Sequence, residues 1–180
     1  AAGEAAYQSC AGCHGANGEG NPALNAPNLT RLDSRYMARQ LRHYRNDIRG
    51  TAREDSPGQT MVAIARGIEP DTEADLLAYI ESFNAVDVDG TLVGDIANGQ
   101  RLYGACVACH GAGGEGKVLL SAPALAGQSD LYLKRQLEHF SMGWRGKHPE
   151  DQFGTQMRLM TRTIHSPERL RDLLSYIAML

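Results

Sequence analysis

The sequence contains one short motif twice, and its residue types are those that attach haem covalently. The copies are Cys10-Ala11-Gly12-Cys13-His14 and Cys106-Val107-Ala108-Cys109-His110. Two thiols three positions apart can each add to one vinyl group of a haem. The adjacent histidine is then carried under the ring, where its imidazole can coordinate the iron. The two copies use all four cysteines of the chain. The motif therefore predicts two covalently bound haem c groups.

Two other chemistries also use Cys-x-x-Cys pairs. Four cysteines can bind zinc, and a single pair can act as a redox dithiol. Neither explains a histidine directly after both pairs. Structural zinc sites usually place their pairs roughly 12 to 20 residues apart, whereas the copies here begin at positions 10 and 106, which are 96 apart. Haem attachment is therefore the preferred interpretation, with zinc binding and dithiol chemistry as the alternatives.

Composition and charge narrow the class of protein. The chain has 180 residues, of which 42% are hydrophobic and 22% charged, as in ordinary globular proteins of one large or two small domains. Its longest apolar runs are a few residues, far short of the ~20 that a membrane span needs. The net charge of -3 supplies no basic patch for a phosphate backbone, so nucleic acid is not expected as a partner. Small residues at Ala1-Ala2-Gly3 fit the mature side of a secretory cleavage, so we expect an exported, periplasmic protein whose signal peptide has been removed.

The haem motif belongs to a longer internal repeat. Adding 96 to the residue number takes the glycine-rich stretch 15–20 to 111–116. Near the end of the chain the offset becomes 97, so one residue is inserted before the last element of the second half. A unit of this length is too long for a solenoid repeat and indicates a duplicated domain. Residue pairs that follow the repeat include Gly3 and Gly99, Tyr7 and Tyr103, Pro27 and Pro123, Gln40 and Gln136, His43 and His139, and Leu76 and Leu173.

Each half is predicted to be helical. A first helix should run from Gly3 to about Cys13, followed by a glycine-rich loop. Apolar residues at helical spacing predict a middle helix, capped by Ser34 or Ser129, and a last helix, which Ser166-Pro167 begins in the second half. The apolar stripes are Tyr36, Met37, Leu41 and Tyr44 with Tyr132, Leu133, Leu137 and Phe140, then Leu76, Leu77, Ile80 and Phe83 with Leu173, Leu174, Ile177 and Leu180.

The predicted fold is all-α with two domains. Their bounds are 1–83 and 95–180, because residues 84–94 show no helical period and are typical of a linker. No alternating strand pattern of useful length appears. Domains of this size have marginal cores, so the haem is expected to supply much of each interior.

The sixth iron ligand is predicted from the repeat as well. Met61 and Met157 occupy equivalent positions, each three residues after a glycine, and each is expected in a loop before the last helix. A lone methionine is usually core filler, but two at matching positions of a haem-bearing repeat favour thioether ligands. Such ligands raise the reduction potential and close the iron to external molecules. Met160 is a competitor for the role of Met157.

The repeated His43 and His139 are the other candidate ligands, and bis-histidine ligation would lower the potential. They have charged neighbours and lie off the apolar stripe, so we expect surface residues. Four further side chains are long enough to reach haem propionates: Arg49, Arg53, Trp144 and Arg145.

The two haem motifs, the proline after each glycine-rich loop, the Tyr-x-x-x-Gln-Leu helices and the methionine before each last helix closely resemble the dihaem cytochromes c4. The resemblance covers nearly the whole chain. It implies a tandem duplication of a class I cytochrome c domain, with the two haem domains related by pseudo-twofold symmetry. It also implies that the prolines steady the proximal histidines. The ligand pairs implied are His14 with Met61 and His110 with Met157.

The function expected from this interpretation is single-electron transfer and not catalysis. No set of catalytic residues is visible in the sequence, and all four cysteines belong to the haem motifs. We expect a monomer that passes electrons from a membrane respiratory complex to a terminal oxidase or another acceptor, with peripheral membrane contact left open. One alternative is an electron-transfer subunit of a larger, flavocytochrome-like dehydrogenase. Another is a dihaem enzyme such as a peroxidase.

Charge is distributed unevenly along the chain. Residues 1–83 hold eight basic and eleven acidic residues, a balance of -3, residues 84–94 add two acidic ones, and residues 95–180 hold ten basic and eight acidic, a balance of +2. Such asymmetry either orients the molecule on a partner or reflects unrelated solvated faces.

Overall fold

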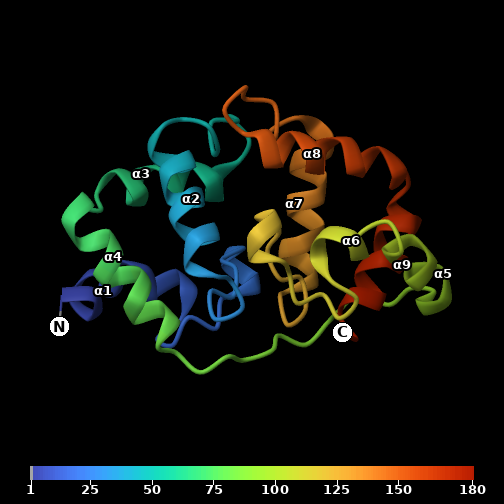
Figure 1. The fold of residues 1–180 in the computed structure, drawn as a ribbon, viewed down its shortest axis with the longest axis horizontal. Helices are drawn as coiled ribbons and strands as arrows, with labels where there is room; N and C mark the ends of the chain where they lie inside the picture. Colours follow the sequence, from blue (N-terminus) through green and yellow to red (C-terminus); the bar gives the residue numbers. More distant parts are fainter. Residues whose placement is uncertain (1) are drawn as a thin grey trace. The chain divides into compact units, whose positions relative to one another are not determined.

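The computed structural model describes residues 2–180 and is helical throughout (Figure 1). Within these residues, β-structure is limited to two isolated bridges, Asn21 with Ala26 and Lys117 with Ala122. The prediction of an all-α fold is confirmed. The chain divides into two compact units, Ala1–Val86 and Asp87–Leu180, here called the N-terminal and the C-terminal unit.

The N-terminal unit is built on the crossing of its first and last helices. Gly3 lies so close to the backbone of Asp75 that any larger side chain would collide with it. One turn later, the ring of Tyr7 is 1% exposed and packs 5.0 Å from the ring of Phe83. A small residue followed by an aromatic one lets the two helices approach closely. The elements are α1 (Ala2–His14), η1 (Pro22–Leu24), α2 (Ser34–Arg45), α3 (Ser56–Arg66) and α4 (Pro70–Glu81).

The C-terminal unit repeats this arrangement with one difference. Gly99 lies against the backbone of Asp172 as Gly3 lies against Asp75. The first helix, however, is divided, because Gly104 ends it and Cys106 begins a second short helix. Glycine is a poor helix former, and Gln8 stands at the equivalent place in the unbroken α1. The elements are α5 (Ile96–Tyr103), α6 (Val107–His110), η2 (Val118–Leu120), α7 (Asp130–Met142), α8 (Gln152–Met160), η3 (Thr161–Thr163) and α9 (Pro167–Ile177).

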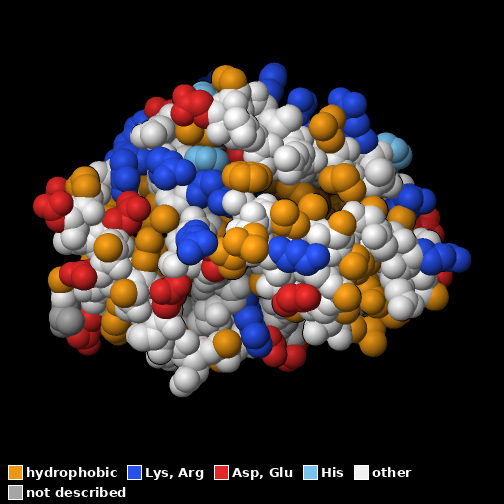
Figure 2. Space-filling model, in the orientation of Figure 1, with side chains coloured by type: hydrophobic (Ala, Val, Ile, Leu, Met, Phe, Trp, Pro, Cys, Tyr) orange, Lys and Arg blue, Asp and Glu red, His pale blue; other side chains and the backbone are white. Residues whose placement is uncertain are grey.

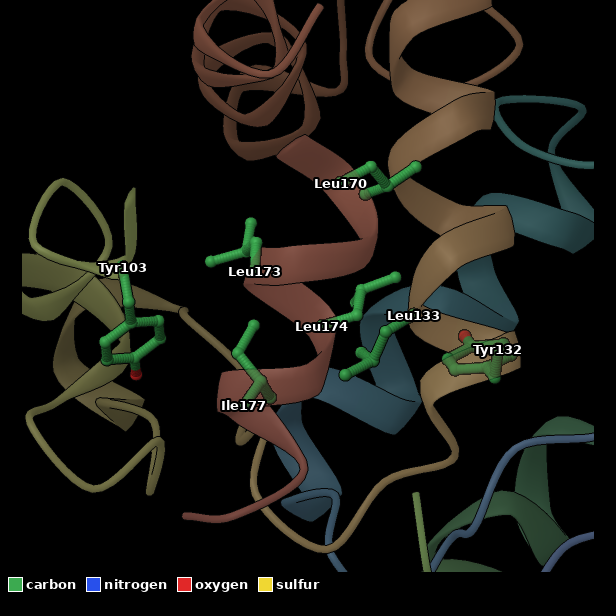
Figure 3. Close-up of a cluster of buried hydrophobic side chains, with 7 residues drawn as sticks. All are labelled: Tyr103, Tyr132, Leu133, Leu170, Leu173, Leu174 and Ile177. Atoms are coloured by element: carbon green, nitrogen blue, oxygen red, sulfur yellow. The ribbon is translucent and has the colours of Figure 1, made fainter. Parts of the chain in front are cut away.

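The core of the C-terminal unit lies on both sides of α9 (Figure 3). Leu173 and Ile177 point toward Tyr103 of α5, whereas Leu174 points toward Leu133 of α7. Leu174 is fully buried. The apolar stripes predicted for the middle and last helices therefore supply the core. The N-terminal core contains the equivalent residues Tyr7, Met37, Leu76, Leu77 and Ile80.

Helix caps agree with the sequence in part. Ser129 accepts a hydrogen bond from the Tyr132 amide and caps α7, and Ser166 caps α9 as predicted. In α2 the cap is Asp33, which accepts from the Tyr36 amide, so the prediction of Ser34 was wrong. Aspartate and serine cap equally well, and the chain uses the residue one position earlier.

Residues 84–95 form neither helix nor strand, and their second part is held to the C-terminal unit by two buried carboxylates. Asp130 accepts hydrogen bonds from the amides of Thr91 and Leu92, at 2.5 and 2.7 Å. Asp172 accepts from the Asp95 amide and the Asn98 side chain, both at 2.8 Å. These hydrogen bonds favour the charged carboxylate and lower the pKa of Asp172. The carboxylates thus fix the path of the chain into α5.

Candidate haem sites

In the N-terminal unit the haem motif forms the end of α1. Cys10 is half-buried and packs against the hydrophobic core, whereas Cys13 is exposed. Residues three positions apart on a helix are neighbours on its surface. Cys10 lies on the side of this pair that faces the core, and Cys13 lies on the side that faces solvent. Neither forms a disulfide. Burial raises the pKa of the Cys10 thiol.

The C-terminal unit presents the same set from the short helix α6. Cys106 packs against the core and Cys109 is exposed. Burial raises the pKa of the Cys106 thiol as well. The same inner and outer placement therefore arises in both units, although α1 is continuous and α5 is separated from α6.

The imidazole of each motif is fixed by a main-chain carbonyl. The Nδ1 atom of His14 lies 3.0 Å from the carbonyl oxygen of Pro27, and that of His110 lies 2.8 Å from the carbonyl oxygen of Pro123. Because a carbonyl only accepts, Nδ1 carries the proton and Nε2 keeps its lone pair. Burial lowers the pKa of both histidines, which favours the neutral imidazole that a metal needs.

The loop after each motif brings that carbonyl into place. The Gly20 amide donates to the His14 carbonyl at 2.7 Å, and the chain then returns to run alongside Gly20. Any side chain at Gly20, whose φ is +84°, would collide with the backbone at Pro27 and Asn28. Gly116 plays the same part in the C-terminal unit. A glycine is required here because the backbone conformation is left-handed and the approach is close.

A buried tyrosine hydroxyl ties the same loop to the first helix. Tyr7 donates to the carbonyl of Gly15 at 2.7 Å, and Tyr103 donates to the carbonyl of Gly111 at the same distance. Each glycine directly follows the motif histidine. Burial raises the pKa of both hydroxyls to about 12, so they remain protonated donors. This link was not predicted, although the repeat of both tyrosines pointed to a shared role.

The two predicted distal ligands lie in helices, so the expectation of loops was wrong. Met61 is half-buried in α3 and Met157 half-buried in α8. These helices begin where Asp55 and Asp151 accept hydrogen bonds from the amides three residues later. The amides belong to Gly58 and Gly154, which suggested a loop in the sequence but lie in the first helical turn.

The packing order leaves the motif and the methionine on different supports. In the N-terminal unit α1 packs on α4, α4 packs on α2, and α2 packs on α3. In the C-terminal unit α5, α9, α7 and α8 follow the same order. In each unit the last and the middle helix therefore stand between the methionine helix and the first helix, which carries the motif in the N-terminal unit and precedes it in the C-terminal unit. A porphyrin bonded to the motif would need its two axial ligands from opposite sides, so ligands on separate elements would suit it.

His43 and His139 are buried, at 4% and 5% exposure, so the prediction of surface residues was wrong. The chain folds back over the end of each middle helix. The amides of Ile48 and Arg49 donate to the carbonyl of His43, and the ring of Trp144 packs 4.9 Å from that of His139. The helical stripe could not reveal this cover, because it is supplied by the following loop.

A buried arginine next to each middle helix is a candidate to bind a haem propionate. Arg49 donates to the Gln40 side chain and lies over the ring of Tyr44, both within the interior. Arg145 donates to Gln136 in the same way. A buried cation is stabilised by an anion, and haem carries two carboxylates. Of the other two candidates, Arg53 is exposed and Trp144 half-buried.

Over residues 2–180, no three His, Cys, Asp or Glu side chains are grouped as a metal site requires. In the same range, no helix combines the length and apolar character that crossing a membrane would take.

Comparison with known proteins identifies the repeated unit. The sequence profile of the cytochrome c family matches residues 1–84 and again residues 96–180. The chain belongs to the cytochrome c family. Each match contains one complete haem motif, the proline whose carbonyl holds the histidine, and the candidate methionine. The duplicated domain predicted from the repeat, and the tandem of cytochrome c domains implied by the resemblance, are confirmed.

Two named relatives define the branch of the family. The chain is 35% identical over 167 residues to a thiosulfate dehydrogenase electron acceptor of Stutzerimonas stutzeri, covering 87% of this chain and 74% of that protein. It is 33% identical over 156 residues to cytochrome c4 of Pseudomonas aeruginosa, covering 81% and 72%. The resemblance to dihaem cytochromes c4 is confirmed.

A solved structure supports the fold. The thiosulfate dehydrogenase TsdBA of Marichromatium purpuratum is 28% identical with a TM-score of 0.79, over 98% of this chain and 39% of that one. This cytochrome therefore spans well under half of that protein. The present chain is a dihaem c-type electron carrier with two covalently bound haem c groups. When bound, each haem supplies a one-electron ferric–ferrous couple.

Proposed function

We propose that the cytochrome carries single electrons through two hexacoordinate haems, with His14 and Met61 as ligands in the N-terminal unit and His110 and Met157 in the C-terminal unit. The observation that carries this proposal is the matched pair of Nδ1 contacts to Pro27 and Pro123, which leaves Nε2 free for iron in both units. Thioether ligands would fill the opposite face and keep external ligands out.

The chain's own residues would hold the haems in three ways. The thiols at 10, 13, 106 and 109 anchor the porphyrins, and the carbonyl-bound imidazoles set the ligand orientation. The buried pairs of Arg49 with Gln40 and Arg145 with Gln136 would neutralise propionates. We propose domain bounds of 1–83 and 95–180 with a linker at 84–94, supported by the lack of regular structure at 84–95.

Spectroscopy tests the ligand assignment. The ferric protein should show a sulfur-to-iron charge-transfer band from both haems, and the ferrous protein should not bind carbon monoxide. Uptake of carbon monoxide at either iron, or a haem content of one per chain, would refute the assignment. A haem that lacks the band yet excludes carbon monoxide, and that takes up carbon monoxide in a variant of His43 but not of Met61, would identify bis-histidine ligation instead.

For the partners, we propose that the cytochrome receives electrons from a periplasmic dehydrogenase of the thiosulfate-oxidising type and passes them toward a terminal oxidase. The support is the relative named as an electron acceptor of thiosulfate dehydrogenase, together with the fold match to part of TsdBA. A donor in the membrane, such as a quinol-oxidising complex, is the second candidate, supported by the cytochrome c4 relative. A periplasmic location follows the same resemblance.

We propose a carrier and not an enzyme, so substrate alone should reduce it slowly. Stopped-flow mixing of the ferric cytochrome with thiosulfate plus a purified thiosulfate dehydrogenase should give fast reduction, whereas thiosulfate by itself should not. Turnover with thiosulfate alone, or with hydrogen peroxide, would show an enzyme. Fast reduction by a quinol-oxidising complex but not by the dehydrogenase would favour the membrane donor.

A further inference from the structure

Three consecutive apolar side chains stand in solvent on one rigid turn of the C-terminal unit. Val118, Leu119 and Leu120 form η2 and are 46%, 94% and 48% exposed. Figure 2 shows that hydrophobic side chains reach the surface elsewhere too, between charged ones, and single exposures of that kind need no explanation. Three consecutive exposed apolar side chains do need an explanation, because together they form a continuous apolar surface. We call these three residues the apolar tip.

The tip is held by its own backbone. Lys117 and Ala122 exchange two hydrogen bonds, at 2.9 and 3.1 Å, at its base. The turn closes at Ser121, whose φ of +56° is left-handed, and the Ser121 amide donates to the Val118 carbonyl. The exposure is therefore a feature of a closed turn.

The N-terminal unit shows that this backbone does not need those side chains. Its η1 turn has the same bridge, between Asn21 and Ala26, and the same left-handed closing residue, Asn25 with φ +57°. In sequence, Asn21-Pro22-Ala23-Leu24 replaces Lys117-Val118-Leu119-Leu120. Alanine thus stands where the most exposed leucine stands in the other unit. Leucine is shared only at the third position, where Leu24 is 50% exposed, so the fold does not require the large side chain of Leu119, and this favours a role in binding.

The tip lies beside the haem motif of its unit. The ammonium group of Lys117 donates to the carbonyl of Ala108 at 2.9 Å, and Ala108 lies between the two motif cysteines. Ala108 and Cys109 are exposed, so a porphyrin bonded to Cys109 would have that edge near solvent. A partner that covers the tip would come near that edge, as electron transfer requires.

Charge indicates which kind of partner fits. Lys117 places a cation at the base of the tip, where the N-terminal unit has the neutral Asn21. The nearby Glu115 has the equivalent Glu19 in the N-terminal unit, so Lys117 is the charge by which the two turns differ. Residues 95–180 carry an excess of two positive charges. An acidic rim on the partner would complement this surface and speed encounter, and an apolar centre would cover the leucines.

We propose that a redox protein with an apolar centre and an acidic rim docks on the apolar tip, so that electrons are exchanged with the partner through the C-terminal unit. The proposal rests on the carrier function proposed above. Small electron-transfer complexes bury little area, and three apolar side chains with one cation suit an interface of that kind.

The test uses the holoprotein and matched variants. Leu119→Ala installs the residue of the other unit and should lower the second-order rate of reduction by a protein donor about tenfold. Ala23→Leu, the reverse change in the N-terminal unit, should leave it unchanged. Lys117→Asn should weaken the salt dependence of the rate. The donors are thiosulfate dehydrogenase with thiosulfate and, separately, a reduced acidic blue-copper protein. Ascorbate, a small donor that needs no docking surface, should reduce every variant at the same rate.

The outcomes separate the two proposals. If the dehydrogenase fails to reduce the wild type but the copper protein shows the Leu119→Ala effect, the proposed donor is wrong and the docking surface stands. Equal rates for wild type and Leu119→Ala with every protein donor that reduces the wild type would refute the docking surface. It would also be refuted if Leu119→Ala abolished sedimentation with anionic lipid vesicles, or dimerisation, without changing those rates.

Discussion

The proximal sides of the two haem sites are nearly identical, whereas the surfaces around them differ. The contacts of His14 and His110 with their proline carbonyls differ by 0.2 Å, from 3.0 to 2.8 Å, and both tyrosine links measure 2.7 Å. In contrast, the turns after the motifs carry different side chains on one backbone. The comparison teaches that ligand orientation tolerates little change, while the residues that a partner meets are free to diverge.

The largest expected effect comes from removing the haem anchor of one unit. Replacing Cys10 and Cys13 by Ala should halve the haem content and unfold most of the N-terminal unit, because a domain of this size has a marginal core without the porphyrin. Replacing Cys106 and Cys109 should do the same to the C-terminal unit. Pyridine haemochrome assay and circular dichroism measure both. A fully helical N-terminal unit without haem would contradict this.

The next effect concerns the distal ligands. Met61→Ala and Met157→Ala should each remove half of the sulfur-to-iron charge-transfer band and lower one reduction potential, by roughly a few hundred millivolts within the ~0.8 V range that axial ligands control. Redox titration followed by spectroscopy measures this. The matched control is Met160→Ala, which should leave the band intact. If Met160→Ala and not Met157→Ala removes it, the ligand of the C-terminal unit has been misassigned.

A smaller effect concerns stability, because equivalent substitutions in the two units should change the free energy of unfolding by different amounts. Asp130→Ala removes the buried carboxylate that accepts from the amides of Thr91 and Leu92 and should cost about 1–3 kcal/mol in the free energy of unfolding. The equivalent Ser34→Ala removes no such contact and should cost little. Denaturant titration measures both. Equal losses would show that Asp130 does not hold the segment before α5.

The pH dependence of stability should also differ between units. Because folding lowers the pKa of Asp172 from 3.8, its contribution is present above about pH 4 and is lost as pH falls through the folded pKa. Asp172→Asn should therefore reduce the fall in Tm of the wild type below pH 4. Asp75→Asn, at the equivalent and exposed position, should not. Identical acid profiles for all three proteins would contradict the role of Asp172.

The smallest effect should be equal in the two units. Tyr7→Phe and Tyr103→Phe each remove one buried hydroxyl that donates to the loop beside the proximal histidine. The loss should be about 1 kcal/mol in the free energy of unfolding of that unit. Thermal unfolding followed at the haem absorption band measures it. A clear difference between the two variants would show that the proximal sides are less alike than their distances indicate.

Much of this architecture is predictable from the sequence, because the duplication provides an internal comparison. The haem motifs, the crossing of Gly3 with Tyr7 and the apolar stripe of the last helix all follow from spacing. Helix α3 was missed because Gly58 resembles a loop residue, and only the cap from Asp55 shows that a helix begins there. The burial of His43 was missed for another reason. It depends on a loop that returns over the helix end, and helical periodicity contains no information about such a return.

The acceptor for each motif histidine is a main-chain carbonyl, and this limits how the site can be damaged. No side-chain substitution at Pro27 or Pro123 deletes that oxygen. The acceptor that orients each histidine therefore cannot be removed by a point mutation of the residue that supplies it. The vulnerable positions are instead the glycines opposite, Gly20 and Gly116, where any change pushes the carbonyl away. A saturation mutagenesis screen for haem retention should therefore find intolerance at these two glycines as well as at the cysteines and histidines of the motifs.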